Sequence, residues 1–183
     1  MKKNTIADET LILIKPDLSY ADEIVSYRRE MLDVESSLDG CGVLRNVSDP
    51  AEWIRNSMLF EREETLPDKN LVPATQFICV RKEDRRIVGI IQVRHYFNEY
   101  LKLYGGHIGY SVRPSERRKG YAKWMLRAVL PVCKELGLSE VLITCNKDNE
   151  GSRKTILANG GRYDGEILEP NEKRVLQRYW ISL

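Results

Sequence analysis

The sequence contains few of the residues that most often bind transition metals. Its 183 residues include 2 histidines and 4 cysteines, and no two cysteines have CxxC spacing. Because structural zinc sites are usually built from such closely spaced ligands, we expect no bound metal. Cys133 and Cys145 lie in apolar runs, where a thiol more often packs than reacts, and free cysteines suit a reducing compartment.

Long apolar runs and an excess of one charge are also missing. The apolar run at residues 11–14 is followed at once by Lys15, Pro16 and Asp17, so it is too short for a signal peptide or a membrane span. Lys and Arg total 29 against 27 Asp and Glu, which gives a formal net charge of +2. This balance is unlike that of a general polyanion binder. We therefore expect a cytoplasmic protein that binds neither nucleic acid nor membrane.

The pattern of apolar residues predicts helices and strands of one α+β domain, residues 1–183, with a mixed sheet. Strands are expected at 11–14, 76–80, 86–93, 107–112, 141–145, 162–168 and 174–181, and helices at 20–32, 51–62, 122–136 and 152–159. The segment 141–145 is uniformly apolar, which is typical of a buried parallel strand. Pro131 lies inside the longest helix and predicts a mild kink rather than a break.

A basic turn, Arg117-Arg118-Lys119-Gly120, lies between the strand 107–112 and the longest helix. The first turn of a helix has backbone N–H groups without partners, and the helix dipole favours an anion there. Gly120 permits close approach of a bulky anion, and the three basic side chains add positive charge. The turn therefore indicates a diphosphate site, although a basic turn that only solvates a helix start has the same composition.

The stretch Arg117-Arg-Lys-Gly120-Tyr-Ala122 matches the signature [Gln/Arg]-x-x-Gly-x-[Gly/Ala], and Asn149-x-x-Ser152 follows the next strand. Because these motifs, the long helix and the next strand follow one another in this order, residues 76–168 resemble the GNAT superfamily of acetyl-CoA-dependent N-acetyltransferases. The resemblance implies a three-layer α+β GNAT fold, with a mixed, mostly antiparallel sheet of about six or seven strands flanked by about four helices. It also implies acetyl-CoA as the acetyl donor and an amine as the acceptor.

The same resemblance implies a cofactor site. In GNAT enzymes the strand corresponding to 107–112 diverges from the one corresponding to 141–145, and pantetheine lies in the gap. Backbone near Val112 then binds pantetheine, and the turn and helix start bind the diphosphate. The implied cofactor-binding residues are Val112, Arg117, Arg118, Lys119, Gly120, Tyr121, Ala122, Lys123, Asn149 and Ser152.

Direct attack by an amine on the thioester needs a base, because an ammonium has no lone pair. His107 occupies a position where many relatives carry Glu, and an imidazole titrates in the useful range. His107 is therefore the candidate base, and a structural, hydrogen-bonded histidine is the alternative. His95 and Glu99 are further candidates.

Many GNAT enzymes carry a tyrosine that protonates the departing CoA thiolate, seven residues after the motif Asn. Here that position holds Ile156. Tyr110, the second catalytic candidate, or Tyr163 is then left to donate the proton, unless the thiolate leaves unassisted.

The sequence leaves the acceptor open among a small molecule, a peptide N-terminus and a lysine. It is also consistent with a non-catalytic acyl-CoA-binding domain, or with a nucleic-acid-binding or partner-binding module that uses the basic patch 113–119. The final hairpin, residues 162–181, has a strand edge that makes a homodimer possible.

Overall fold

The computed structural model describes residues 6–183. Its helices are α1 (Ala21–Asp33), α2 (Pro50–Leu59), α3 (Tyr121–Glu135) and α4 (Glu150–Leu157). Its strands are β1 (Ile6–Ala7), β2 (Leu11–Ile14), β3 (Ala74–Arg81), β4 (Arg86–Arg94), β5 (Ile108–Val112), β6 (Glu140–Asn146), β7 (Arg162–Glu169) and β8 (Arg174–Ser182). Each helix and strand predicted from the sequence has a counterpart, and β1 is an addition.

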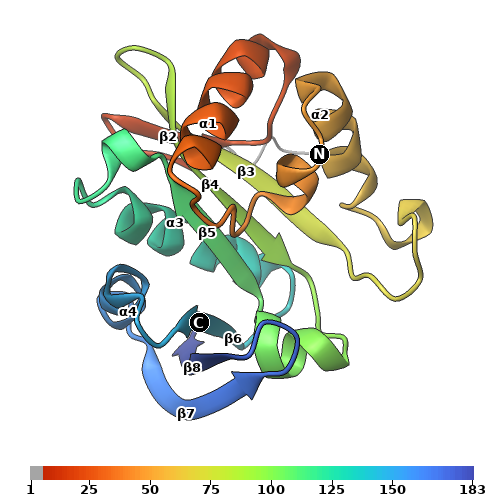
Figure 1. The fold of residues 1–183 in the computed structure, drawn as a ribbon, viewed down its shortest axis with the longest axis vertical. Coiled ribbons are helices and arrows are strands. Elements are labelled where there is room, and N and C mark those ends of the chain that lie inside the picture. The colour runs from red at the N-terminus through yellow and green to blue at the C-terminus, as the bar shows by residue number, and fades with distance from the viewer. Residues whose placement is uncertain (1–5) are drawn as a thin grey trace.

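The strands form two sheets rather than one. The first has the order β1-β2-β3-β4-β5 and the second the order β6-β8-β7, and every pair is antiparallel. Figure 1 shows the five-stranded sheet in the upper part of the molecule and the three-stranded sheet below it. The parallel pairing expected for 141–145 is wrong for the described residues, because the one ladder partner of β6 there is β8 and no ladder joins β6 to β5.

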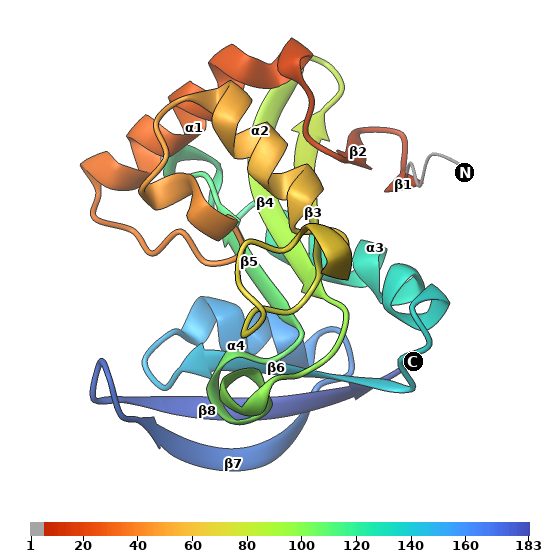
Figure 2. The ribbon, with the colours of Figure 1, turned by 90° about the vertical axis from the view of Figure 1, so that its right-hand side faces the viewer.

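Helices cover both faces of the five-stranded sheet (Figure 2). Successive residues of a strand point to opposite faces, and on β3 both sets are apolar. Phe77 and Cys79 join the core beneath α3, whereas Ile78 and Val80 join the core beneath α1 and α2. A strand that is buried on both faces explains the continuous apolar run in the sequence.

A β-bulge in β4 lies beside the end of β5. Cys79 pairs with Gly89 and Val80 with Ile87, so Val88 is the extra residue. A Cβ on Gly89 would lie 2.6 Å from the terminal methyl carbon of Met125, so the glycine lets α3 pack closely against the sheet.

The helix ends follow the sequence signals. The Asp49 carboxylate caps α2 by accepting a hydrogen bond from Ala51 N at 3.0 Å. Helix α3 continues through Pro131, as predicted, and Gly137 follows it with φ +86°.

Between residues 6 and 183, no helix combines the length and apolar character that crossing a bilayer requires. The same residues contain no group of three or more His, Cys, Asp or Glu side chains placed to hold a metal ion.

Candidate active site

Strands β5 and β6 are joined by hydrogen bonds just before β5 begins, and then separate. His107 N donates to Leu142 O at 2.7 Å, and Leu142 N donates to the imidazole Nδ1 of His107 at 3.0 Å. A Cβ on Gly106, whose φ is +65°, would lie 2.6 Å from Leu142 O, so this close approach requires glycine. Among the described residues, β5 has no ladder partner on its β6 side, and its backbone groups there face a gap.

A cleft of about 730 Å³ occupies this gap. Its walls come from segments far apart in the sequence: the loop 36–40 between α1 and α2, strand β5, the turn and helix start 116–123, and residues 144–155 of β6 and α4. This volume suits a ligand of cofactor size. The residues predicted to bind the cofactor therefore lie around one cleft, with the exception of the Lys119 side chain.

Helix α3 begins at the cleft without a side-chain cap. Its N-cap residue, Gly120, has φ +86°, and no atom lies within 4 Å of the position that a Cβ would take. The first amides of a helix have no partner within the helix, so those of Tyr121, Ala122 and Lys123 are available to an anion. The open space beside Gly120 lets a large anion reach them.

The basic side chains of the turn have different surroundings. Arg117 and Arg118 line the cleft, and Arg117 Nε donates to Val112 O at 3.3 Å. Lys119 Nζ instead pairs with the Glu116 carboxylate at 2.8 Å, and Lys119 is not part of the cleft wall. The side chains of the turn thus place two positive charges in the cleft rather than three.

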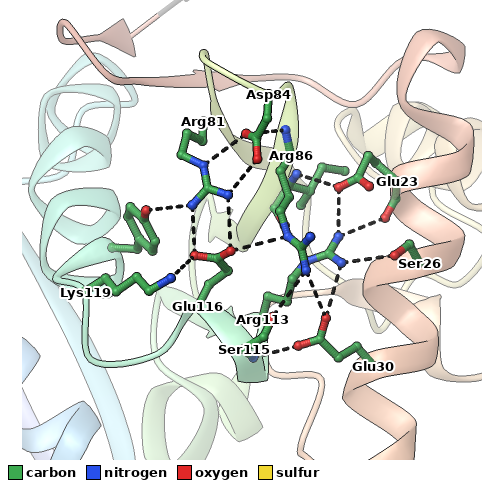
Figure 3. Close-up of polar contacts among 12 residues, drawn as sticks. Glu23, Ser26, Glu30, Arg81, Asp84, Arg86, Arg113, Ser115, Glu116 and Lys119 are labelled. Carbon is green, nitrogen blue, oxygen red and sulfur yellow. Dashed lines mark hydrogen bonds and ion pairs between the residues drawn. The ribbon is translucent and has the colours of Figure 1, made fainter.

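An ion-pair network holds the turn in place from behind (Figure 3). The nearly buried Glu116 carboxylate lies 2.9 Å from Arg81 Nη1 and 3.4 Å from Arg86 Nε, both of the β3–β4 hairpin. Arg81 also pairs with Asp84 at 2.7 Å. Burial acts to raise the pKa of Glu116, but the hydrogen bonds and charges of Lys119 and Arg81 outweigh this effect and lower it.

A second part of this network is centred on Arg113, directly after β5. Its side chain is 1% exposed and pairs with Glu23 at 2.9 Å and Glu30 at 3.3 Å, both on α1. Arg113 Nε also donates to Ile87 O at 2.7 Å, and Ser115 N donates to Glu30 at 2.6 Å. The turn is therefore attached to α1 as well as to the hairpin.

The opposite wall of the cleft is the start of α4. Asn149 Oδ1 accepts a hydrogen bond from Ser152 N at 3.0 Å and so caps this helix. The Tyr110 hydroxyl, from β5, lies 2.8 Å from Ser152 Oγ. Tyr110 therefore spans the cleft, and burial raises the pKa of its phenol.

His107 has a largely buried environment next to the cleft rather than in its wall. The residue is 4% exposed, and its ring lies 3.8 Å from the ring of Phe97, centroid to centroid. Desolvation, aided by the charge of Arg94, lowers its pKa from 6.5 to about 4. With Nδ1 bonded to Leu142, these contacts favour the structural alternative for His107.

The other candidates from the sequence are spread over the molecule. His95 contacts Thr75 Oγ1 at 2.8 Å, Glu99 is exposed, and neither lines the cleft. Ile156 is fully buried in the core, and Tyr163 is 57% exposed on β7. Tyr110 is the one of the two proposed proton donors that lies in the cleft.

The cleft wall also contains charged residues that were not predicted from the sequence as part of the site: Asp39, Arg94, Glu116, Lys154 and Arg174. Asp39 and Glu116 are the carboxylates of the cleft wall, and within the described residues Asp39 makes no ion pair. Arg94 donates from Nη1 to Gly105 O at 3.0 Å and to Gly106 O at 3.2 Å, also without an ion pair in the described part of the chain.

The model of the acetyltransferase (GNAT) domain family matches residues 10–162. No match is found among curated protein sequences. The solved structure of the microcin C7 self-immunity acetyltransferase MccE with acetyl-CoA and AMP is similar, with TM-score 0.72 and 20% identity over 96% of this chain and 94% of that one. Ribosomal-protein-S5-alanine acetyltransferase from Vibrio fischeri has TM-score 0.74 and 17% identity, with coverage of 97% and 96%. RimJ from Mycobacterium smegmatis with CoA-disulfide has TM-score 0.74 and 16% identity, with coverage of 99% and 88%.

The chain therefore belongs to the GNAT acetyltransferase family. It is an acetyl-CoA-dependent N-acetyltransferase, and the predictions of family, fold class, enzyme class and acetyl donor are confirmed.

Proposed function

We propose that the protein transfers the acetyl group of acetyl-CoA to a primary amine by direct attack within a ternary complex. One observation carries the proposal: the open edge of β5 and the uncapped start of α3 line the same cleft. The strand edge offers backbone groups to the pantetheine amides, and the helix start offers N–H groups to the diphosphate. MccE and RimJ, which share the fold, have acetyl-CoA and CoA-disulfide bound.

The cofactor contacts follow from this arrangement. Backbone at Val112 binds pantetheine, and the amides from Gly120 to Lys123 bind the diphosphate together with the side chains of Arg117 and Arg118. We assign Lys119 a backbone contact alone, because its ammonium group pairs with Glu116. Asn149 and Ser152 border the pantetheine from the α4 side.

Tyr110 protonates the departing thiolate. Its hydroxyl lies in the cleft, 2.8 Å from Ser152 Oγ, at the start of the helix that carries Ile156 in place of the usual tyrosine. The phenol is protonated at neutral pH and so carries a proton to donate. Burial raises its pKa and makes it a weaker acid, so its position in the cleft is the argument for the role.

Asp39 accepts the proton of the amine. It is the carboxylate of the cleft wall that makes no ion pair among residues 6–183, whereas three cations neutralise Glu116. The loop that carries it lies on β5, because a Cβ on Gly40 would lie 2.1 Å from Gly109 O. A role of His107 as the base stays a prediction.

The test is release of free thiol from acetyl-CoA over a panel of amines, together with calorimetric titration of CoA. Amine-dependent thiol release and CoA binding are expected. Binding of CoA without thiol release for any amine would favour the non-catalytic acyl-CoA-binding alternative. Failure to bind CoA would contradict both.

A further inference from the structure

The strand face that carries Arg94 also borders a second cavity. This cavity has a volume of about 290 Å³ and shares Arg94, Tyr100 and Leu101 with the cleft, so the two spaces adjoin. Its other walls are mostly apolar, with Val43, Trp53, Phe60, Leu71 and Val72 among them. Within the described residues, Arg94 is the one ionised side chain that lines it.

The Arg94 guanidinium group has unused hydrogen-bonding capacity. Nη1 donates to Gly105 O and Gly106 O, which fixes the plane of the group. Nε and Nη2 have no hydrogen-bond partner in the described part of the chain, and neither is among its fully buried unpaired atoms. Arg94 lines both cavities. A half-buried guanidinium group without a carboxylate partner is costly, and an anionic ligand that accepts two hydrogen bonds relieves that cost.

Two charges of opposite sign therefore lie at this end of the cleft. Asp39 and Arg94 both line it, and the Asp39 charge raises the pKa of Arg94 against the larger, lowering effect of desolvation. The basic residues Arg117, Arg118 and Lys123 lie at the α3 end, where the diphosphate is proposed to bind. Arg94 is thus left for the acceptor rather than for the cofactor.

We propose that the acceptor is a free amino acid with an apolar side chain, whose carboxylate binds Arg94 Nε and Nη2. Its ammonium group then lies toward Asp39, and its side chain enters the second cavity. This assignment rests on the proposed function and adds the chemical class of the acceptor. It makes Arg94 a specificity-determining residue, because an amine without a carboxylate leaves the guanidinium group unpaired.

The first test is independent of turnover and uses the products, N-acetyl amino acids, with the CoA-loaded protein. Calorimetry would compare N-acetylphenylalanine with N-acetylphenylalaninamide, which lacks the negative charge. The acid is expected to bind at least about tenfold more tightly, and N-acetylphenylalanine more tightly than N-acetylglycine because of the apolar cavity. Equal binding of acid and amide, or tighter binding of the amide, would overturn the inference.

The second test uses Arg94→Gln and Arg94→Lys in the same titrations and in thiol-release assays. Both variants are expected to lose the preference for acid over amide while their Kd for CoA is unchanged, which also shows that they fold. A retained preference in a CoA-binding variant would exclude Arg94 as the determinant. A higher kcat/KM for carboxylate-free amines or peptide N-termini than for free amino acids would overturn the inference while it supports acetyl transfer itself.

Discussion

The imidazole of His107 accepts a hydrogen bond at Nδ1 from the backbone amide of Leu142, 3.0 Å away. This bond requires an unprotonated Nδ1, and a pKa lowered to about 4 keeps the ring neutral near pH 7. His107 thus fixes the point at which β5 and β6 separate, and the position of the cleft depends on it.

Replacing His107 with Ala is expected to lower the free energy of unfolding by about 2 kcal/mol, because the Leu142 amide loses its acceptor. His107→Asn is the matched control, since its side-chain oxygen can take the place of Nδ1. Chemical denaturation and thiol-release assays would measure both. If His107→Asn folds well but is as inactive as His107→Ala, the imidazole itself is needed for proton transfer.

The lowered pKa of His107 predicts that the stability of the protein depends on pH. Its pKa is about 4 in the folded protein against 6.5 as the ordinary value, so the unfolded chain binds more protons between these pH values. His107 therefore contributes full stability above pH 6.5, and this contribution, at most about 3 kcal/mol, is lost as the pH falls to 4. Urea denaturation between pH 4 and 7 is expected to show a smaller loss in His107→Asn than in the wild type. An identical loss in both would exclude His107 as its source.

Gly120→Ala is expected to weaken CoA binding about tenfold or more, because the added methyl group enters the space of the diphosphate. Gly137 is a matched control at the other end of the same helix, with the same φ of +86° and open surroundings. Both variants should lose about 1 kcal/mol of stability from the left-handed conformation. Equal CoA affinity in the two variants would contradict the proposed diphosphate site.

Tyr110→Phe is expected to lower kcat about 100-fold with little change in the Kd for CoA, because only the proton donor is lost. Tyr163→Phe, on the exposed face of β7, should leave kcat unchanged. Steady-state kinetics with one amine would compare them. If the Tyr163 variant loses activity instead, Tyr163 rather than Tyr110 is the proton donor.

Asp39→Asn is expected to lower kcat/KM about 100-fold near pH 7, with partial recovery at high pH, where the free amine is already deprotonated. Its Kd for CoA should stay at the wild-type value, because Asp39 is not among the residues proposed to bind CoA. A pH–rate profile parallel to that of the wild type would argue against Asp39 as the proton acceptor.

The sequence predicts the elements better than it predicts the side chains of the site. The periodicity of apolar residues is a local property, and it gives every helix, and every strand except β1, to within a few residues. Lys119 pairs with Glu116, three residues earlier, and the position of Glu116 depends in turn on its contacts with Arg81 and Arg86, at least thirty positions before it in the chain. A basic turn alone does not tell which of its side chains face a ligand.

Asp39 and Arg94 are two further side chains whose place in the site could not be predicted from the sequence. Neither belongs to a sequence motif. Asp39 enters the site because the loop 36–40 crosses β5 at Gly109, and Arg94 because it ends β4, the strand next to β5. The two glycines at that crossing, Gly40 and Gly109, were the available signal, since each leaves room for the other's backbone. The sequence alone, however, does not show how the strands pair, and so it does not show that these two glycines meet.

The order β6-β8-β7 has a consequence for the time at which the site is completed during synthesis. β8 is the middle strand of this sheet, yet it follows both neighbours in the sequence. On the ribosome, β6 and β7 have no ladder partner in this sheet until residues 174–182 have emerged, whereas β1 to β5 can pair as they appear. The five-stranded sheet, which forms one wall of the cleft, can therefore be complete in the nascent chain while the other sheet still lacks its middle strand, β8.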